Sequence, residues 1–209
     1  MFSFLRGASA CNTMQLPLFP LRTVLYPGGI LPLRIFEQRY VELTKACLKD
    51  GSPFGVCLIT RGEEVARDPA APAQFATIGT LATIDEWDMP ELGIFHVRTA
   101  GGARFEVLSH AVRPDGLVVA NVARIPAEPA VAPTAAHAPL VQLLEVLATR
   151  IGPRHFPAAP AFDDASWVGY RLAELLPLPL PIKQGMLEIN DGNVRLEVLR
   201  QFLAQQGVL

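Results

Sequence analysis

The sequence predicts an α+β fold: a barrel-like β domain with one early helix, followed by a helical bundle. Three observations predict this order. Short apolar stretches separated by Gly- or Pro-containing turns fill residues 16–125. A Pro- and Ala-rich segment covers 126–139, and beyond it apolar residues recur with helical spacing. Half of the 209 residues are hydrophobic and only 18% are charged, so the chain can bury a substantial core.

The first predicted element is a set of two or three short strands over residues 16–35. Prolines and a Gly-Gly pair interrupt the aliphatic stretch from Leu16 to Tyr40. Each proline fixes φ and removes a backbone donor, so the extended pieces must be short. Tyr26-Pro27-Gly28-Gly29 is predicted to be a turn, because Pro-Gly fits the central positions of a type II turn.

Residues 36–49 are predicted to form the helix of this half. Apolar side chains recur on one helical face, while Glu, Gln and Lys fill most of the rest. The apolar face consists of Phe36, Tyr40, Leu43, Cys47 and Leu48. Gly51 and Pro53 are expected to end the helix.

The other elements of this half are predicted strands joined by turns and loops. The strands cover residues 54–60, 75–84, 94–99, 103–108 and 117–125. The polar, Pro-rich stretch 61–73 is predicted to be a loop. Gly101-Gly102 is predicted to be a tight hairpin turn, and Pro114-Asp115-Gly116 another turn.

The composition divides the chain into four parts. Residues 1–13 are expected to be a flexible leader, with Met1 or Met14 as the native start, and 14–125 the β domain. Residues 126–139 are interpreted as a semi-rigid linker and 140–209 as a helical subdomain.

Four helices are predicted in the helical subdomain. They cover 140–151, 165–176, 181–189 and the stretch that begins near residue 191. Asp163 or Asp164 is expected to cap the second, Pro181 to open the third, and Asp191 or Asn193 to cap the last.

Charge and composition argue against several functional classes. The net charge is -2 and the chain has only three lysines, so it lacks the basic stripe typical of nucleic-acid binding. No apolar run approaches the roughly 18 residues of a membrane span. Cys47 and Cys57 lie among apolar neighbours and are interpreted as buried free thiols, which favours a cytoplasmic location.

Catalytic and metal-binding motifs are missing from the sequence. There is no Gly-Lys dipeptide for a phosphate loop and no HExxH for zinc. The four histidines lie on different predicted elements, and His137 and His155 are expected to be solvated. We therefore predict no enzymatic activity, no metal and no cofactor.

Four residues are candidates for binding a peptide: Trp87, His96, Arg98 and Arg104. Trp87 lies in an acidic stretch, residues 85–88, which is predicted to be a loop. It would either contact a partner or cover the end of the barrel. His96 would face outward or line a groove, and the two arginines, which flank the expected hairpin, could grip a carboxylate or lie on a solvated surface.

Several short motifs, in the right order from about residue 15 to 125, resemble the Lon N-terminal (LON) domain. They are LPLFPL at 16–21, the Tyr-Pro-Gly turn, FEQRY at 36–40, FATIGT at 75–80 and GARFEV at 102–107. The resemblance implies a PUA-like pseudo-barrel followed by a helical bundle. It also implies a stand-alone domain without the ATPase and peptidase of Lon, and it carries no catalytic residues.

The resemblance implies a non-catalytic module that binds unfolded or hydrophobic polypeptide segments. Two alternatives stay open. PUA-like barrels often bind RNA, although the charge of this chain argues against nucleic acid. The chain could also be a small-molecule enzyme that uses residues 85–88 or the strand of His96. The oligomeric state does not follow from the sequence.

Overall fold

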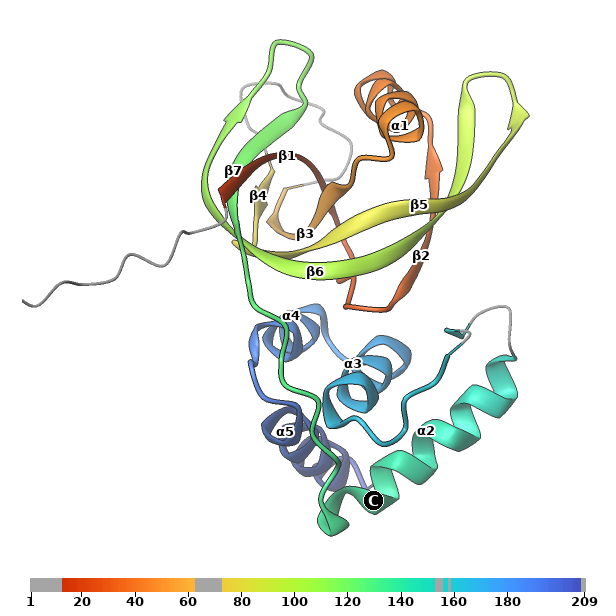
Figure 1. Cartoon of the computed structure of the whole chain (residues 1–209), viewed down its shortest axis with the longest axis vertical. Coiled ribbons are helices and arrows are strands. Elements are labelled where there is room, and N and C mark those ends of the chain that lie inside the picture. The colour runs from red at the N-terminus through yellow and green to blue at the C-terminus, as the bar shows by residue number, and fades with distance from the viewer. Residues whose placement is uncertain (1–12, 63–72, 153–155, 158, 208–209) are drawn as a thin grey trace, which may run out of the picture.

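The computed structural model describes residues 13–62, 73–152, 156–157 and 159–207. It has a β half and a helical half, which lie one above the other in Figure 1. The predicted α+β class and the order of its parts are confirmed. Residues 1–12 of the expected leader and most of the expected loop 61–73 lie outside the described residues, as does His155, while Thr13 is the first residue of a strand.

The β half contains seven strands and one helix among the described residues. These are β1 (Thr13–Leu21), β2 (Ile30–Ile35), α1 (Gln38–Asp50), β3 (Phe54–Arg61), β4 (Gln74–Phe75), β5 (Ile78–Glu91), β6 (Ile94–Val112) and β7 (Val118–Arg124). The strand order is β1-β7-β6-β5-β3-β4, and β1 also pairs with β3 in parallel. That pairing closes five strands into a barrel, which removes most of their free edges.

Three apolar clusters form the core. Inside the barrel, Leu16, Leu18 and Val122 pack around the fully buried Phe105. A second cluster lies under α1, where the rings of Phe19 and Tyr40 stack with centroids 3.8 Å apart. The third is formed mainly by the helices but includes residues of the β half. The two halves therefore share one core cluster.

The Gly101-Gly102 pair does not form the predicted hairpin, because it lies inside the continuous strand β6. The Tyr26 turn crosses the strand at this point. Gly28 N–H donates to Gly101 O at 2.7 Å, and a Cβ on Gly101 would lie 2.1 Å from Tyr26 O. Gly101 is thus required for close approach of two backbones rather than for chain reversal.

The chain reverses instead between Glu91 and Ile94, where Gly93 has a φ of 83°. Residues 85–88, predicted to be a loop, therefore belong to strand β5, and that prediction is wrong. A loop was predicted here because Asp and Glu are uncommon in strands. The solvent-facing strand edge of β5 tolerates them.

The helix α1 begins two residues later than predicted, and Phe36 lies outside it with 58% of its surface exposed. Gly51 ends the helix in a left-handed conformation, with φ of 64°. The turn at Tyr26–Gly29 is confirmed, since Gly29 N–H donates to Tyr26 O and Gly28 has a positive φ.

The helical half contains α2 (Ala138–Ile151), α3 (Ala165–Leu175), α4 (Leu180–Glu188) and α5 (Gly192–Gln205), with a short 3-10 turn at Ala135–His137. Asp164 caps α3 by accepting a hydrogen bond from Ser166 N–H, and Asp191 caps α5 in the same way. Between the halves, residues 125–134 run along the helices without regular structure (Figure 1). We call this segment the strap.

His137, expected to be solvated, is buried with 4% exposure, and that expectation is wrong. Its Nδ1 lies 3.1 Å from Thr134 Oγ1 and 3.2 Å from Asn193 Oδ1. The surrounding Pro and Ala residues suggested a solvated linker, but the strap packs on α5 at this point.

Candidate functional site

Beyond the barrel, β2, β6 and the second half of β5 form a three-stranded sheet that we call the arm. Its strands align in cross-strand rows. Arg98 lies between Pro32 and Glu86, and in the next row His96 lies between Arg34 and Asp88. In antiparallel strands, directly opposed residues point to the same face. The two rows therefore present polar side chains on one face of the arm.

A groove of about 470 Å³ follows these rows. It is lined by Pro32, Leu33, Arg34, Glu86, Trp87, Asp88, His96, Val97 and Arg98. Three of the four candidates, Trp87, His96 and Arg98, thus line one groove, although Trp87 lies in the intervening row opposite Val97 and its ring packs against Phe95.

The charged groups of the groove are exposed and only loosely paired. Arg98 donates to Glu86 at 3.1 Å, and Arg34 lies 3.7 Å from Glu91 with both side chains more than half exposed. Asp88 accepts a hydrogen bond from the neighbouring backbone N–H of Met89. Exposed pairs of this kind contribute little to stability, so these side chains can reorient toward a ligand.

The β5–β6 hairpin carries exposed apolar side chains beside the groove. Trp87 is 54% exposed and its ring lies 5.8 Å from that of Phe95, while Met89 and Leu92 are 40% and 97% exposed. Figure 1 shows the hairpin extending outward from the barrel, with β5 on its outer side. Exposed apolar groups gathered on one projection are typical of interaction surfaces.

Arg104 is not in this groove, so the two arginines do not flank a common surface. Its side chain is 4% exposed and reaches from β6 to the helical half. There its Nη1 donates to Leu187 O at 2.7 Å and to Ile189 O at 3.0 Å. The carboxylate that it contacts belongs to the chain itself, at Glu128 of the strap.

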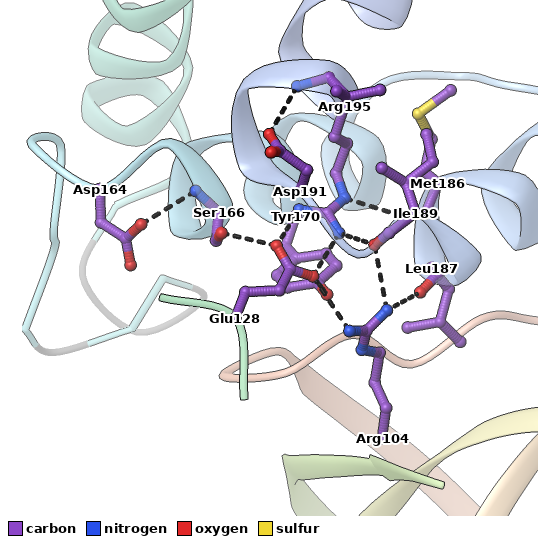
Figure 2. A network of polar contacts seen from close by, with 11 residues as sticks. Arg104, Glu128, Asp164, Ser166, Tyr170, Met186, Leu187, Ile189, Asp191 and Arg195 are labelled. Carbon is purple, nitrogen blue, oxygen red and sulfur yellow. Dashed lines mark hydrogen bonds and ion pairs between the residues drawn. The ribbon is translucent and has the colours of Figure 1, made fainter. Parts of the chain in front are cut away.

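Glu128 is the centre of a buried polar network (Figure 2). Arg195 makes a bidentate pair with it, at 3.0 Å and 2.6 Å, and Ser166 Oγ donates at 2.6 Å. Tyr170 OH donates to the same carboxylate, and Arg104 lies 3.2 Å away. Burial raises the pKa of Glu128, but the hydrogen bonds from Arg195, Ser166 and Tyr170 outweigh it and hold the pKa below its ordinary value.

A second set of contacts joins the Tyr26 turn to α3. Arg171, fully buried, donates to the carbonyls of Pro27 and Gly28 and lies 3.2 Å from Glu174. Burial raises the pKa of Glu174, which the charge of Arg171 only partly opposes. The halves are therefore held together by backbone-directed arginines at two places.

Glu128, Tyr170 and Arg195 are functional candidates that were not predicted from the sequence. One signal was available for Glu128, because it is the single charged residue in the Pro- and Ala-rich stretch 126–139. A lone carboxylate in such a stretch indicates a specific partner. No pattern marked Arg195, which lies between Val194 and Leu196 and is one of several polar residues in this amphipathic helix.

Among the described residues, no group of three or more His, Cys, Asp or Glu is placed to hold a metal ion. Cys47 and Cys57 are buried and free, and burial raises the pKa of the Cys57 thiol to about 12. None of the helices in the described ranges is both long and apolar enough to cross a membrane.

The chain is similar to known proteins over most of its length. It is 36% identical to a crystal structure described as a Lon N-terminal domain protein from Xanthomonas campestris, with a TM-score of 0.74, covering 90% of this chain and 98% of that one. The N-terminal domain of Mycobacterium avium complex Lon protease has the same fold, with a TM-score of 0.64 at 18% identity over 91% of this chain and 98% of that one.

Curated relatives are Lon proteases, of which this chain spans only a small part. It is 37% identical to Lon protease of Anaeromyxobacter dehalogenans over 44% of this chain and 11% of that protein. It is 28% identical to Lon protease of Phenylobacterium zucineum over 96% of this chain and 26% of that protein. The family model of the ATP-dependent protease La (LON) substrate-binding domain matches residues 15–205, and the chain belongs to this family.

Proposed function

We propose that the chain is a non-catalytic module that binds unfolded or hydrophobic polypeptide segments at the groove of the arm. The observation that supports this most is the position of Trp87, Met89 and Leu92. These exposed apolar side chains lie on one projecting hairpin, beside a groove with polar walls. The family is described by substrate binding, and its curated members in this comparison are proteases that act on proteins.

The β5–β6 hairpin and the groove beside it together offer the two kinds of group that an unfolded polypeptide needs. Trp87 and Met89 offer apolar surface to hydrophobic side chains. Arg34, His96 and Asp88 offer donors and acceptors to a peptide backbone. Because these polar groups are exposed and weakly paired, they suit many sequences rather than one.

We expect contact through side chains rather than addition of a strand to β2. Pro32 has no N–H and so interrupts the edge of β2. The N–H of Ile30 already donates to Glu174. A peptide that lies across the face of the arm avoids this edge.

The groove brings Asp88 and His96 into one row, but they are open to solvent and no Ser, Thr, Cys or Lys side chain lies in the lining, which favours binding over catalysis. The buried free thiols of Cys47 and Cys57 suit the reducing cytoplasm.

The proposal is tested by titrating the protein into a fluorescently labelled, permanently unfolded model protein and following anisotropy. We expect saturable binding that the same model protein in its folded form does not show. Single-stranded RNA at low salt serves as the competing class of ligand. Equal binding to the folded form, no binding at all, or tighter salt-dependent binding to RNA would overturn the proposal.

A further inference from the structure

The junction of the two halves contains four hydrogen-bond donors that converge on one point. They are the guanidinium groups of Arg104 from β6 and Arg195 from α5, and the hydroxyls of Ser166 and Tyr170 from α3. All four side chains are more than nine-tenths buried. The acceptor at the point of convergence, Glu128, comes from the strap (Figure 2).

The two arginines among these donors also make contacts that do not involve Glu128. Arg104 Nη1 donates to the carbonyls of Leu187 and Ile189. Arg195 Nε donates to Met186 O at 2.8 Å, and its guanidinium lies 3.8 Å from the centre of the Tyr170 ring. The two guanidinium groups are therefore positioned by contacts other than those with Glu128.

The charge of the site matches a carboxylate. Two buried guanidinium groups surround a single carboxylate, and the bidentate geometry at Arg195 fits its two oxygens. Without Glu128, two cations would remain buried and uncompensated, which is strongly unfavourable. An anion with the geometry of a carboxylate would relieve this.

A pocket of about 280 Å³ leads to the site from solvent. Its lining includes Arg104, Glu128, Ser166 and Tyr170, with Pro27, Ala103, Ile125 and Trp167 among its other walls. The pocket therefore borders three of the four donors, and removal of the Glu128 side chain would extend it toward Arg195.

We propose that this junction is a carboxylate-binding site, which the chain fills with its own Glu128 and which accepts a carboxylate from solution when that side chain is removed. The strap is then bound as an internal ligand. Its carboxylate connects strand β6 to helices α3 and α5, and so links the β half to the helical half.

The experiment is a chemical rescue of Glu128→Ala in the full chain. Thermal unfolding is followed while sodium acetate replaces sodium chloride at constant ionic strength. Glu145→Ala, which removes an exposed carboxylate on α2, is the matched control. Glu128→Gln is the second variant, because its amide fills the space of the carboxylate but supplies no charge.

We expect acetate to raise the unfolding midpoint of Glu128→Ala by about 4 °C at roughly ten times its dissociation constant, and to saturate. The wild type, Glu145→Ala and Glu128→Gln should respond no more to acetate than to chloride. Equal responses of all four proteins would overturn the proposal.

If Glu128→Ala does not fold in chloride, it is refolded in parallel in acetate and in chloride. Recovery of folded protein in acetate alone supports the proposal. Failure in both salts, with Glu128→Gln folded, overturns it. This outcome is independent of polypeptide binding at the arm, which Glu128 does not line.

Discussion

Arg104 Nη2 lies 3.2 Å from Glu128 Oε1, and neither side chain is more than 5% exposed. Arg104 was a candidate for binding an external carboxylate, and in the structure it binds an internal one. Removing it would take away the hydrogen bond to Leu187 O and one of the two arginines that contact Glu128, while Ile189 O would keep its hydrogen bond from Arg195.

We therefore expect Arg104→Ala to lower the free energy of unfolding by about 3–5 kcal/mol, because it breaks a buried ion pair. Urea denaturation measures this. Arg98→Ala is the control, since Arg98 is a third exposed and pairs with the open Glu86, and we expect it to change stability by less than about 0.5 kcal/mol. Equal effects of the two variants would contradict the buried role of Arg104.

The Glu128 network should make stability depend on pH. The pKa of Glu128 is lowered in the folded protein, so its contribution is present above the ordinary value of 4.5 and is lost as the pH falls through the folded value. We expect the difference in unfolding free energy between wild type and Glu128→Gln to be constant near neutral pH and to shrink below about pH 4.5. A difference that grows in acid would contradict the assignment. Comparing two variants cancels the opposite contribution of Glu174, whose pKa is raised.

Replacing two glycines by alanine, one in FATIGT at 75–80 and one in GARFEV at 102–107, should change stability by different amounts. A Cβ on Gly79 would lie 2.5 Å from Val56 O and 2.6 Å from Phe105 Cζ, inside the barrel. We expect Gly79→Ala to cost about 1–3 kcal/mol of stability by overpacking. At Gly102 the nearest atom would be 3.5 Å away, in ordinary contact, so Gly102→Ala should change stability by less than about 0.5 kcal/mol. Chemical denaturation of both variants checks this, and the opposite order would show that the barrel interior is packed differently.

The boundary at residue 125 can be tested by expressing residues 14–125 alone. Tyr26, Val24 and Leu58 of the β half pack in the cluster formed by the helices, and Tyr26 OH donates to Lys183 O at 2.8 Å. Because the fragment would expose this apolar surface, we expect it to aggregate or to give poorly dispersed amide NMR signals. A well-dispersed, monomeric spectrum would show that the β half folds by itself.

Local patterns were sufficient to predict most elements of the fold. The proline spacing and the turn at Tyr26 allowed the first strands to be predicted. Asp164 and Asp191 were among the residues expected to cap helices, and both do so. The hairpin was misplaced because Gly101 meets a backbone that is distant in sequence, at Tyr26. A glycine needed for such an approach has the same local signature as a glycine in a turn.

The candidate site was predicted less completely. Trp87, His96 and Arg98 were identified by residue type, and the pairing of β5 with β6 brings them together. Arg104 was wrongly grouped with them. Its burial could not be predicted, because a charged side chain is buried only where a partner elsewhere in the chain compensates its charge. That partner, Glu128, lies 24 positions later, and no local periodicity connects the two residues.

Polypeptide binding at the arm predicts that affinity falls when apolar surface is removed from the β5–β6 hairpin. Trp87→Ser with Met89→Ser removes apolar surface from the hairpin, while Val146→Ser with Val194→Ser removes exposed apolar surface from α2 and α5. Affinity for the labelled unfolded protein is measured by anisotropy for both double variants, after thermal unfolding has shown that both are folded. We expect the arm variant to bind at least about tenfold more weakly than wild type, a loss of about 1.4 kcal/mol, and the helix variant to bind like wild type. Unchanged binding by the arm variant, or an equal loss in both, would contradict the account.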